Sequence, residues 1–444
     1  MSEVAIKAKV ARKAALKLAS VSSKVKNSAL LKIASAIMKN REELLRENSE
    51  DLKAAKVLLA KGSISKAFFQ RLKLSEDQLL NVANMVRSVA KLEDPVGKTI
   101  SAIELHRGLD LYRVICPIGV TGAIFEARPD VLPQISALCL KSGNAVILKG
   151  GKEAKSSNEA LFELIRKTSE KAGIPTGWMQ LIEARREVRE LLKLDDLIDL
   201  LVPRGSKDFV KYIQGNTNIP VLGHSDGLCH IYVDVDADIH KAVKVCHDAK
   251  VQYPSVCNAV ETILVHKDIA PVFLGPLGER YMKAGVEVRG DERTRKILPW
   301  ARRAKAKDWS TEYLDLVVSI KVVGGVQEAI DHVNTCGSKH TDSILTENKK
   351  TAIHFLSEVD SSTVMLNTST RFSDGYRYGL GAEVGISTGK IHARGPVGLD
   401  GLTTSKFHLV GDGHVVADYV GKKAKLFSHR RLTATWGDFR KTVK

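Results

Sequence analysis

The chain has 444 residues, 44% of them hydrophobic, which is enough for a sizeable core and for two or three domains. Its six cysteines are widely spaced without a CxxC pair, so the sequence argues against a disulfide framework and favours a reducing, cytoplasmic location. No apolar run reaches the roughly eighteen residues of a membrane helix, and no secretory signal opens the chain, so we expect no membrane contact. We predict no bound metal, because the adjacent cysteine–histidine pairs lack ligand spacing.

The formal net charge is +17, and much of it lies at the N-terminus. The first 39 residues carry nine lysines and arginines against one glutamate. Apolar residues at helical spacing in this segment favour packed helices with a solvated basic outer face. Nucleic-acid binding is the open alternative, but no aromatic side chains are interleaved with the lysines as base stacking would need. We therefore predict no nucleic-acid partner.

The first 91 residues are typical of helices, and the next 25 are typical of strands. Four helices are predicted, at 4–20, 28–60 with a break near Asn40, 63–71 and 75–91. Ser75 with Gln78 three residues later forms a capping-box pattern. Two β-type runs, 100–105 and 109–116, predict a hairpin. Because a long hairpin exposes unpaired edges, we expect it to contact another subunit or domain.

From residue 117 onward, strands alternate with helices, which predicts βαβ units and parallel sheets. The first series includes strands at 117–125, 145–148 and 197–202, and the second those at 231–235, 262–265, 286–289, 316–323, 343–345 and 364–366. Pro203-Arg204-Gly205-Ser206 precedes a predicted helix, and such a loop is a natural anion site. A late hairpin is expected around residues 411–413, and a basic tail follows.

Cys257 lies on a turn-like loop after Pro254 and Ser255, just before the strand at 262–265. A side chain at that position is supported by the rigid strand and remains accessible on the loop, as a nucleophile needs. A free cysteine is more often a small packed hydrophobe, so its position alone does not decide. The sequence has no GxGxxG motif, so a dinucleotide would have to be held in another way.

The run Val256-Cys257-Asn258-Ala259 resembles the nucleophile loop of the aldehyde dehydrogenase superfamily. Longer motifs resemble one branch of it, which reduces L-glutamyl 5-phosphate in proline synthesis; they lie at 117–129, 138–151, 203–206 and 379–387. The resemblance extends from about residue 5 to about residue 420. It implies an aldehyde-dehydrogenase-like α/β fold with two parallel-sheet domains, one for the cofactor and one catalytic, plus a β-hairpin oligomerisation element.

The resemblance also implies domain boundaries and an oligomer. The NADPH-binding domain would comprise 1–99 and 117–235, with part of 364–397. The catalytic domain with Cys257 would span 236–363. The oligomerisation element would combine 100–116 with 398–420, and 421–444 would form the basic C-terminal tail. A homodimer or homotetramer is expected.

By the same resemblance, Cys257 matches the nucleophile, and its backbone N–H and the Asn258 region would donate to the oxyanion. Hydrolytic members carry a glutamate before the strand at 231–235 to activate water. Residues 222–227 contain none, as expected of an enzyme that must keep its thioester from water. His224 and Asp226 are left as candidate polar site residues.

Four residues match the family's cofactor contacts. Lys149 would contact the adenosine ribose or phosphate, and Gly205 and Ser206 would face the pyrophosphate. Glu312 would hold the nicotinamide ribose.

Lys152 stands where members that prefer NAD have an acidic residue, which favours NADPH; a register placing Glu153 there would weaken this expectation. The substrate carries a phosphate and an α-carboxylate, both of which suit the fork of an arginine. Arg128, Arg371 and Arg394 are the candidates, each weighed against an ordinary surface or ion-pair role.

The implied reaction begins with attack of the Cys257 thiolate on the acyl carbon of L-glutamyl 5-phosphate. Phosphate leaves a thioester, which NADPH reduces to L-glutamate 5-semialdehyde. A hydrolytic or coenzyme-A-type NAD(P)-dependent aldehyde dehydrogenase is the alternative of the same fold; the missing glutamate and the Glu-Ala-Arg-Pro motif count against it. A basic nucleic-acid-binding protein is the alternative of another class, and salt-dependent binding would be its signature.

Overall fold

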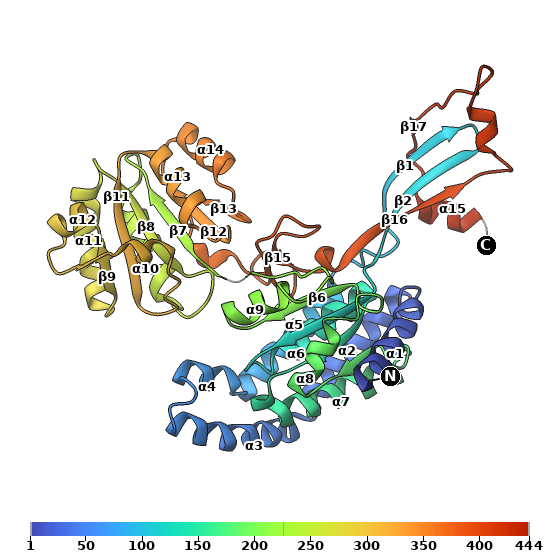
Figure 1. Ribbon diagram of the computed structural model, residues 1–444, viewed down its shortest axis with the longest axis horizontal. Coiled ribbons are helices and arrows are strands. Elements are labelled where there is room, and N and C mark those ends of the chain that lie inside the picture. Colours follow the sequence, from blue (N-terminus) through green and yellow to red (C-terminus); the bar gives the residue numbers. More distant parts are fainter. Residues whose placement is uncertain (1, 225, 443–444) are drawn as a thin grey trace.

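The computed structural model describes residues 2–224 and 226–442 and shows three parts (Figure 1). A helix-rich unit contains a four-stranded sheet, a second unit is built on a seven-stranded sheet, and a slender arm of strands projects away from both. Both large sheets are parallel, whereas the arm is antiparallel. The predicted fold class is therefore confirmed.

Five helices open the chain, and serine side chains begin most of them. Ser2, Ser22, Ser65 and Ser75 each accept a hydrogen bond from a first-turn backbone N–H, and Ser75 with Gln78 completes the predicted capping box. The expected break falls at Asn40. The helices are α1 (Glu3–Leu18), α2 (Ser23–Lys39), α3 (Arg41–Ala60), α4 (Lys66–Leu72) and α5 (Glu76–Lys91).

The first sheet has helices on both faces. Its strands run in the order β5 (Met179–Leu181), β4 (Ala145–Lys149), β3 (Val120–Phe125) and β6 (Leu200–Arg204). Successive side chains of a strand point to opposite faces. Phe125 accordingly packs with α2, α5, α6 (Val131–Ser142) and α7 (Lys155–Lys171), while Ile124 packs with α1 and α8 (Arg185–Leu191). A ninth helix, α9 (Lys207–Gln214), follows β6.

The second sheet has the strand order β10-β9-β11-β8-β7-β12-β13. Its strands are β7 (Cys229–Val233), β8 (Val260–His266), β9 (Glu287–Gly290), β10 (Arg302–Arg303), β11 (Val317–Val323), β12 (Thr341–Leu345) and β13 (Thr363–Leu366). Its helices are α10 (Ile239–Val251), α11 (Ala270–Lys283), α12 (Glu292–Ile297), α13 (Val326–Cys336) and α14 (Lys349–Glu358). Side chains of α10 and α11 share one apolar core, and those of α13 and α14 share another.

Two strands lie in a different sheet from the one the predicted boundaries imply. A boundary at residue 235 assigns β7 to the first unit, but β7 pairs with β8 and β12 in the second. Likewise β13, whose last residues fall in the predicted 364–397 portion of the first unit, pairs with β12. Apolar periodicity identifies a strand but does not identify its neighbours, which explains both differences.

The arm is an antiparallel sheet with the order β16-β2-β1-β17. The predicted hairpin of β1 (Thr99–His106) and β2 (Leu109–Pro117) is confirmed, with Gly108 at φ +77° in its turn. The predicted late hairpin is wrong: β16 (Thr403–Val410) pairs with β2, and residues 416–419 form a short 3-10 turn. In the tail, β17 (Arg430–Arg431) pairs with β1, and Trp436 of α15 (Trp436–Thr442) stacks on His408.

A small two-stranded sheet of β14 (Gly385–Ser387) and β15 (Gly395–Val397) lies in the glycine- and arginine-rich region. Figure 1 shows β15 between the two large units, close to the root of the arm. No described helix has both the length and the apolar character needed to cross a bilayer.

A buried histidine couples the stability of the second unit to pH. His332 on α13 is 7% exposed and lies edge-on to His230 and to Trp309. Burial lowers the pKa of His332 to about 3, and the neighbouring His230 and Lys321 add to this lowering. The unfolded chain, with an ordinary histidine pKa of about 6.5, binds the proton more readily than the folded chain does.

We expect this stabilisation to be complete above about pH 6.5 and to be lost as the pH falls towards 3, at up to about 1.4 kcal/mol per pH unit. Urea unfolding of the wild type and of His332→Gln at pH 7 and pH 5 measures the effect. The variant should be less sensitive to pH by about 2 kcal/mol over this interval. Equal sensitivity in both proteins would show that His332 titrates normally.

Candidate active site

Three polar segments precede neighbouring strands of the seven-stranded sheet. His224 and Gly227 come before β7, Cys257 and Asn258 before β8, and His340 before β12. Strands β8, β7 and β12 are adjacent and parallel. The segments before them therefore meet at one edge of the sheet.

Cys257 is partly exposed on the loop between α10 and β8. Its carbonyl accepts a hydrogen bond from the Cys229 thiol at 3.2 Å, which supports the loop from behind. Gly227 packs directly against it: a Cβ at position 227 would lie 2.5 Å from both Cα and Cβ of Cys257. Only glycine allows this approach, so the segment before β7 fixes the backbone of the cysteine.

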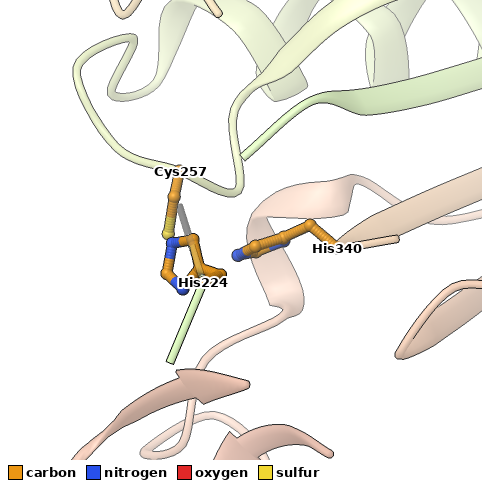
Figure 2. Close-up of side chains that lie close together, drawn as sticks. All are labelled: His224, Cys257 and His340. Carbon is orange, nitrogen blue, oxygen red and sulfur yellow. The ribbon is translucent and has the colours of Figure 1, made fainter. Parts of the chain in front are cut away.

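Two imidazole rings lie beside the thiol (Figure 2). The Cys257 sulfur and one ring nitrogen from each of His224 and His340 all lie within 4.8 Å of one another. His224 Nδ1 lies 2.8 Å from the Ile386 carbonyl oxygen. Burial lowers the pKa of His224, and the Arg204 charge adds to this lowering, while the bond to Ile386 opposes it. His224 is therefore a neutral imidazole at neutral pH.

His340 is a site residue that the sequence did not indicate. Its side chain is completely buried, and its ring meets the His224 ring edge-to-face at 4.8 Å. Nothing in its spacing from Cys257 marks it. The signal that could have found it is its place directly before a strand, but this helps only once β12 is known to lie beside β7.

Asn258 is held too firmly by the protein to move freely. It is 5% exposed, and its Nδ2 donates to the Ser373 carbonyl at 2.8 Å. In the described part of the chain, no acceptor is within hydrogen-bonding distance of the backbone N–H of Cys257 or of Asn258. These two N–H groups, rather than the Asn258 amide, are the donors that an oxyanion could use.

Glu312 lies next to the nucleophile loop. Its Oε1 accepts a hydrogen bond from the Gly227 N–H at 2.9 Å, and Gly227 in turn touches Cys257. Burial raises the pKa of Glu312, and the Gly227 bond opposes this rise. Glu312, which is predicted to contact the nicotinamide ribose, is thus linked to the Cys257 loop through Gly227.

Arg371 lies against the cysteine loop. It is 7% exposed, its Nε donates to the Gln252 side chain at 2.9 Å, and its guanidinium faces the Tyr253 ring. Burial lowers its pKa, and the charge of the neighbouring Arg377 adds to this lowering. An arginine nevertheless stays charged in a protein.

Arg204 and Arg128 add positive charge to the same region. Arg204 donates to the Val384 carbonyl at 2.8 Å, and burial and the neighbouring Arg128 lower its pKa. Arg128 forms an ion pair with Asp130 at 3.2 Å, which raises its pKa. Arg204 belongs to the Pro-Arg-Gly-Ser motif but was not predicted as a substrate residue. Its contact with Val384 and its place near Arg128 became evident only from the fold.

Arg394, the third arginine predicted to contact substrate, is occupied elsewhere. Its guanidinium binds the side chain of Asp360 at 3.1 Å and the backbone carbonyl of the same residue at 3.0 Å. Lys339 and Lys390 bind the same carboxylate, and together these cations lower the pKa of Asp360 to about 2. This cluster is not among the groups that meet at Cys257.

The loop predicted to hold the pyrophosphate bonds a carboxylate side chain of the protein itself. The Ser206 N–H, at the start of α9, donates to the Glu126 carboxylate at 3.2 Å. A Cβ at Gly205 would lie 2.7 Å from that carboxylate, so glycine is needed for the close approach. A helix N-terminus favours negative charge, and this one fits a phosphate group. Lys149 is the last residue of β4, and its side chain donates to the Gly150 carbonyl at 2.8 Å.

Lys152 and Glu153 differ in where they point. Lys152 is exposed at the start of the 3-10 turn 152–154. Glu153 turns back, and its Oε1 accepts the Ala127 N–H at 2.8 Å. Ala127 has φ +46°, an uncommon conformation for a residue with a side chain, so the carboxylate supports a strained turn. Of these two neighbours, Lys152 is therefore the one with an exposed side chain, whereas the Glu153 carboxylate is bound to the backbone.

A buried ion pair lies beneath the loops of the site. Lys250 at the end of α10 and Glu261 in β8 are both fully buried, with Nζ and Oε2 2.8 Å apart. The other carboxylate oxygen accepts the Leu314 N–H at 3.1 Å, and Lys250 also donates to the Asp315 carbonyl. Burial raises the pKa of Glu261 to about 7, and Lys250 opposes this rise. The pair ties the cysteine loop to the Glu312 loop.

Comparison with known proteins gives the class first. Residues 2–316 match the model of the aldehyde dehydrogenase family. The chain therefore belongs to the aldehyde dehydrogenase family.

The relatives narrow this class to one branch, the gamma-glutamyl phosphate reductases. The protein of that name from Natronomonas pharaonis is 57% identical over 97% of this chain and 98% of its own length. The Methanosarcina mazei protein of the same name is 53% identical over 96% and 97%, respectively. The crystal structure of the Thermotoga maritima gamma-glutamyl phosphate reductase superposes with a TM-score of 0.89, at 42% identity, over 93% of this chain and 100% of that one.

We expect Lys250→Met to destabilise the second unit by about 3–5 kcal/mol, because it leaves the Glu261 carboxylate buried without its counter-charge. Lys241→Met is the matched control. Lys241 is on the same helix and pairs with Glu347 at 3.0 Å, but that pair is exposed, and exposed pairs contribute little to stability. Urea unfolding of the two variants makes the comparison, and similar losses would contradict the structural weight given to the buried pair.

Proposed function

We propose that this protein reduces L-glutamyl 5-phosphate to L-glutamate 5-semialdehyde and phosphate, with NADPH as reductant, in proline biosynthesis. The observation that carries the proposal is the setting of the Cys257 thiol. It stands beside a neutral imidazole and two backbone N–H groups that bond no other described residue, and Arg371 and Arg204 add positive charge nearby. The names of the relatives support the choice of substrate.

The chain's own groups can carry out the first half of the reaction. Cys257 loses its proton to the unprotonated nitrogen of His224, because the other nitrogen, Nδ1, is committed to the Ile386 carbonyl. The sulfur then attacks the acyl carbon of the glutamyl phosphate. The backbone N–H groups of Cys257 and Asn258 stabilise the oxyanion, an effect worth roughly 10²–10³ in rate per donor. The C–O bond to phosphate breaks, and a thioester on Cys257 remains.

The arginines suit the double negative charge of the substrate. Phosphate and carboxylate each accept two parallel hydrogen bonds from a guanidinium. Arg371, beside the cysteine loop, and Arg128, which is partly exposed, are our candidates for substrate contacts. Arg204 donates to the Val384 carbonyl and supplies positive charge rather than a flexible contact.

The cofactor expected from the family would supply a hydride to the thioester carbon. Ser206 and Gly205 would hold its pyrophosphate, since that helix start already accepts a carboxylate. Lys149 and Glu312 would contact its two riboses. The exposed ammonium of Lys152 suits a 2′-phosphate, whereas the neighbouring Glu153 is directed towards Ala127. This arrangement supports NADPH over NADH.

Two half-buried carboxylates, those of Glu312 and Glu383, are both engaged by backbone groups. Glu312 accepts the Gly227 N–H, and Glu383 accepts the Gly375 N–H at 2.8 Å. Neither lies in the segment before β7, where the hydrolytic members carry their base. Because these hydrogen bonds engage both carboxylates, they support cleavage of the thioester by reduction rather than by a water molecule that a carboxylate activates.

The decisive experiment runs the reaction in reverse, because an acyl phosphate is labile. L-Glutamate 5-semialdehyde is supplied with NADP or NAD, with and without inorganic phosphate, and formation of the reduced cofactor is followed. We expect turnover that requires phosphate and is faster with NADP. Turnover without phosphate would instead indicate a hydrolytic dehydrogenase.

Cys257→Ser should fold and lose roughly 10³-fold or more of this activity, as enzymes do when their nucleophile is removed. Cys336→Ser is the control, since Cys336 is also a partly exposed free thiol but lies at the end of α13. Equal activity of the two variants would remove Cys257 from the mechanism.

We also propose that the arm joins copies of this chain into a homodimer or homotetramer. Phe407 and Leu409 on the outer strand β16 are 65% and 58% exposed, which is unusual for large apolar side chains on a strand edge. Sedimentation velocity gives the test: an oligomer is expected, and a Phe407→Asp variant should dissociate more readily. A wild-type monomer at micromolar concentration would contradict the proposal.

A further inference from the structure

The thiol and the two imidazoles of the site also make up a metal-ligand set. Cys257, His224 and His340 come from three separate segments, and their potential ligand atoms all lie within 4.8 Å of one another. Figure 2 shows a nitrogen of each ring turned towards the space beside the sulfur. The sequence does not reveal this set because the three residues lack any short spacing.

Hydrogen bonds fix the orientation of both rings. A backbone carbonyl can only accept, so the hydrogen of His224 lies on Nδ1, which bonds Ile386, and Nε2 keeps its lone pair. His340 Nδ1 lies 2.9 Å from the Thr341 hydroxyl and 3.6 Å from the Cys229 sulfur. Metal-binding histidines are held in the same manner, with the second ring nitrogen bonded to a protein group.

The second ring nitrogen of His340 lacks a partner. The side chain is 0% exposed, and among the described residues no group forms a hydrogen bond with Nε2. A buried polar atom left unsatisfied costs about 1–3 kcal/mol. Since Nδ1 faces Thr341 and Cys229, Nε2 is the nitrogen directed towards the cluster, where a ligand would satisfy it.

We propose that Cys257, His224 and His340 form a reversible inhibitory site for a borderline-soft divalent cation, of which Zn²⁺ is the best fit. One thiolate and two neutral imidazoles are donors that Zn²⁺ prefers, and three protein ligands leave a fourth tetrahedral position for water. Bond lengths of about 2.3 Å to sulfur and 2.0 Å to nitrogen would draw the ligand atoms together by roughly an ångström. Rotation of the Cys257 side chain about its Cα–Cβ bond can bring the sulfur towards the two nitrogens.

The cation would remove the nucleophile from use. A sulfur bound to Zn²⁺ has its lone pair engaged, and the nitrogen of His224 that would take the thiol proton is engaged as well. Inhibition of catalysis rests on the proposed function of Cys257, whereas binding of the cation does not. An experiment can therefore refute inhibition of catalysis without refuting binding of the cation.

Cobalt titration of the reduced full-length protein under argon tests the site. Co²⁺ substitutes for Zn²⁺ and gives a sulfur-to-cobalt charge-transfer band and intense visible bands only when it is tetrahedral and bound to thiolate. We expect both bands in the wild type and neither in Cys257→Ser. His340→Gln should weaken binding at least about tenfold, because even loss of an outer-sphere partner costs that much.

His332→Gln is the matched control, since His332 is also buried with an unpartnered Nε2 but faces His230 on the other side of β7. It should bind Co²⁺ as the wild type does. A wild type without a thiolate band, or His340→Gln with unchanged affinity, would overturn the proposal.

A measurement on the wild type alone covers the case in which His340→Gln does not fold. Zn²⁺ should slow alkylation of Cys257 by iodoacetamide, as mapped by peptide mass spectrometry, and a chelator should restore it. Alkylation of Cys336 in the same sample should be unaffected, and equal rates at Cys257 with and without Zn²⁺ would refute the site. A protein that shows this protection but no phosphate-dependent turnover would disprove the reductase proposal and leave the metal site intact.

Discussion

The buried pair of Lys250 and Glu261 is the contact on which the geometry of the active site depends. One charge ends the helix before the cysteine loop, and the other lies in the strand after it, so the loop is closed at its base. The same two side chains reach Leu314 and Asp315, next to Glu312. Charges removed from water are tolerated when they are paired and hydrogen-bonded, and both members of this pair also bond backbone groups. The pair thus holds the Cys257 loop and the segment next to Glu312 together by charge and hydrogen bonds.

Much of the fold was accessible from the sequence because its signals are local. The capping box at Ser75, the break at Asn40 and the hairpin of β1 and β2 each depend on a few adjacent residues, and each is confirmed. The failures concern partners distant in the chain. A run such as 403–410 shows its strand character, but pairing with β2 instead of a nearby segment is a tertiary outcome. The same reason explains why β7 was assigned to the first sheet.

The site divides in the same way. Cys257 and the Pro-Arg-Gly-Ser loop were found because short motifs mark them, and the family resemblance gave them roles. His340 gained importance only from the order of strands β8, β7 and β12 and from the burial of its side chain, and Arg204 only from its neighbours in the fold. Arg394 shows the converse: its residue type suggested a ligand, but Asp360 takes up its donors. The type of a residue suggests that it could bind substrate. The fold decides whether its hydrogen-bond donors face substrate or another side chain.

The arm shows how an exposed sheet edge can be limited in its growth. One edge, along β1, is partly covered by the short strand β17, so β16 is the edge with a full length of backbone available. Two arms that joined through β16 about a two-fold axis would make one continuous sheet whose outer strands are again β17. Such a sheet has nowhere to add a third arm in the same way. Covering one edge turns a surface that could polymerise without end into one that terminates at a defined number of copies.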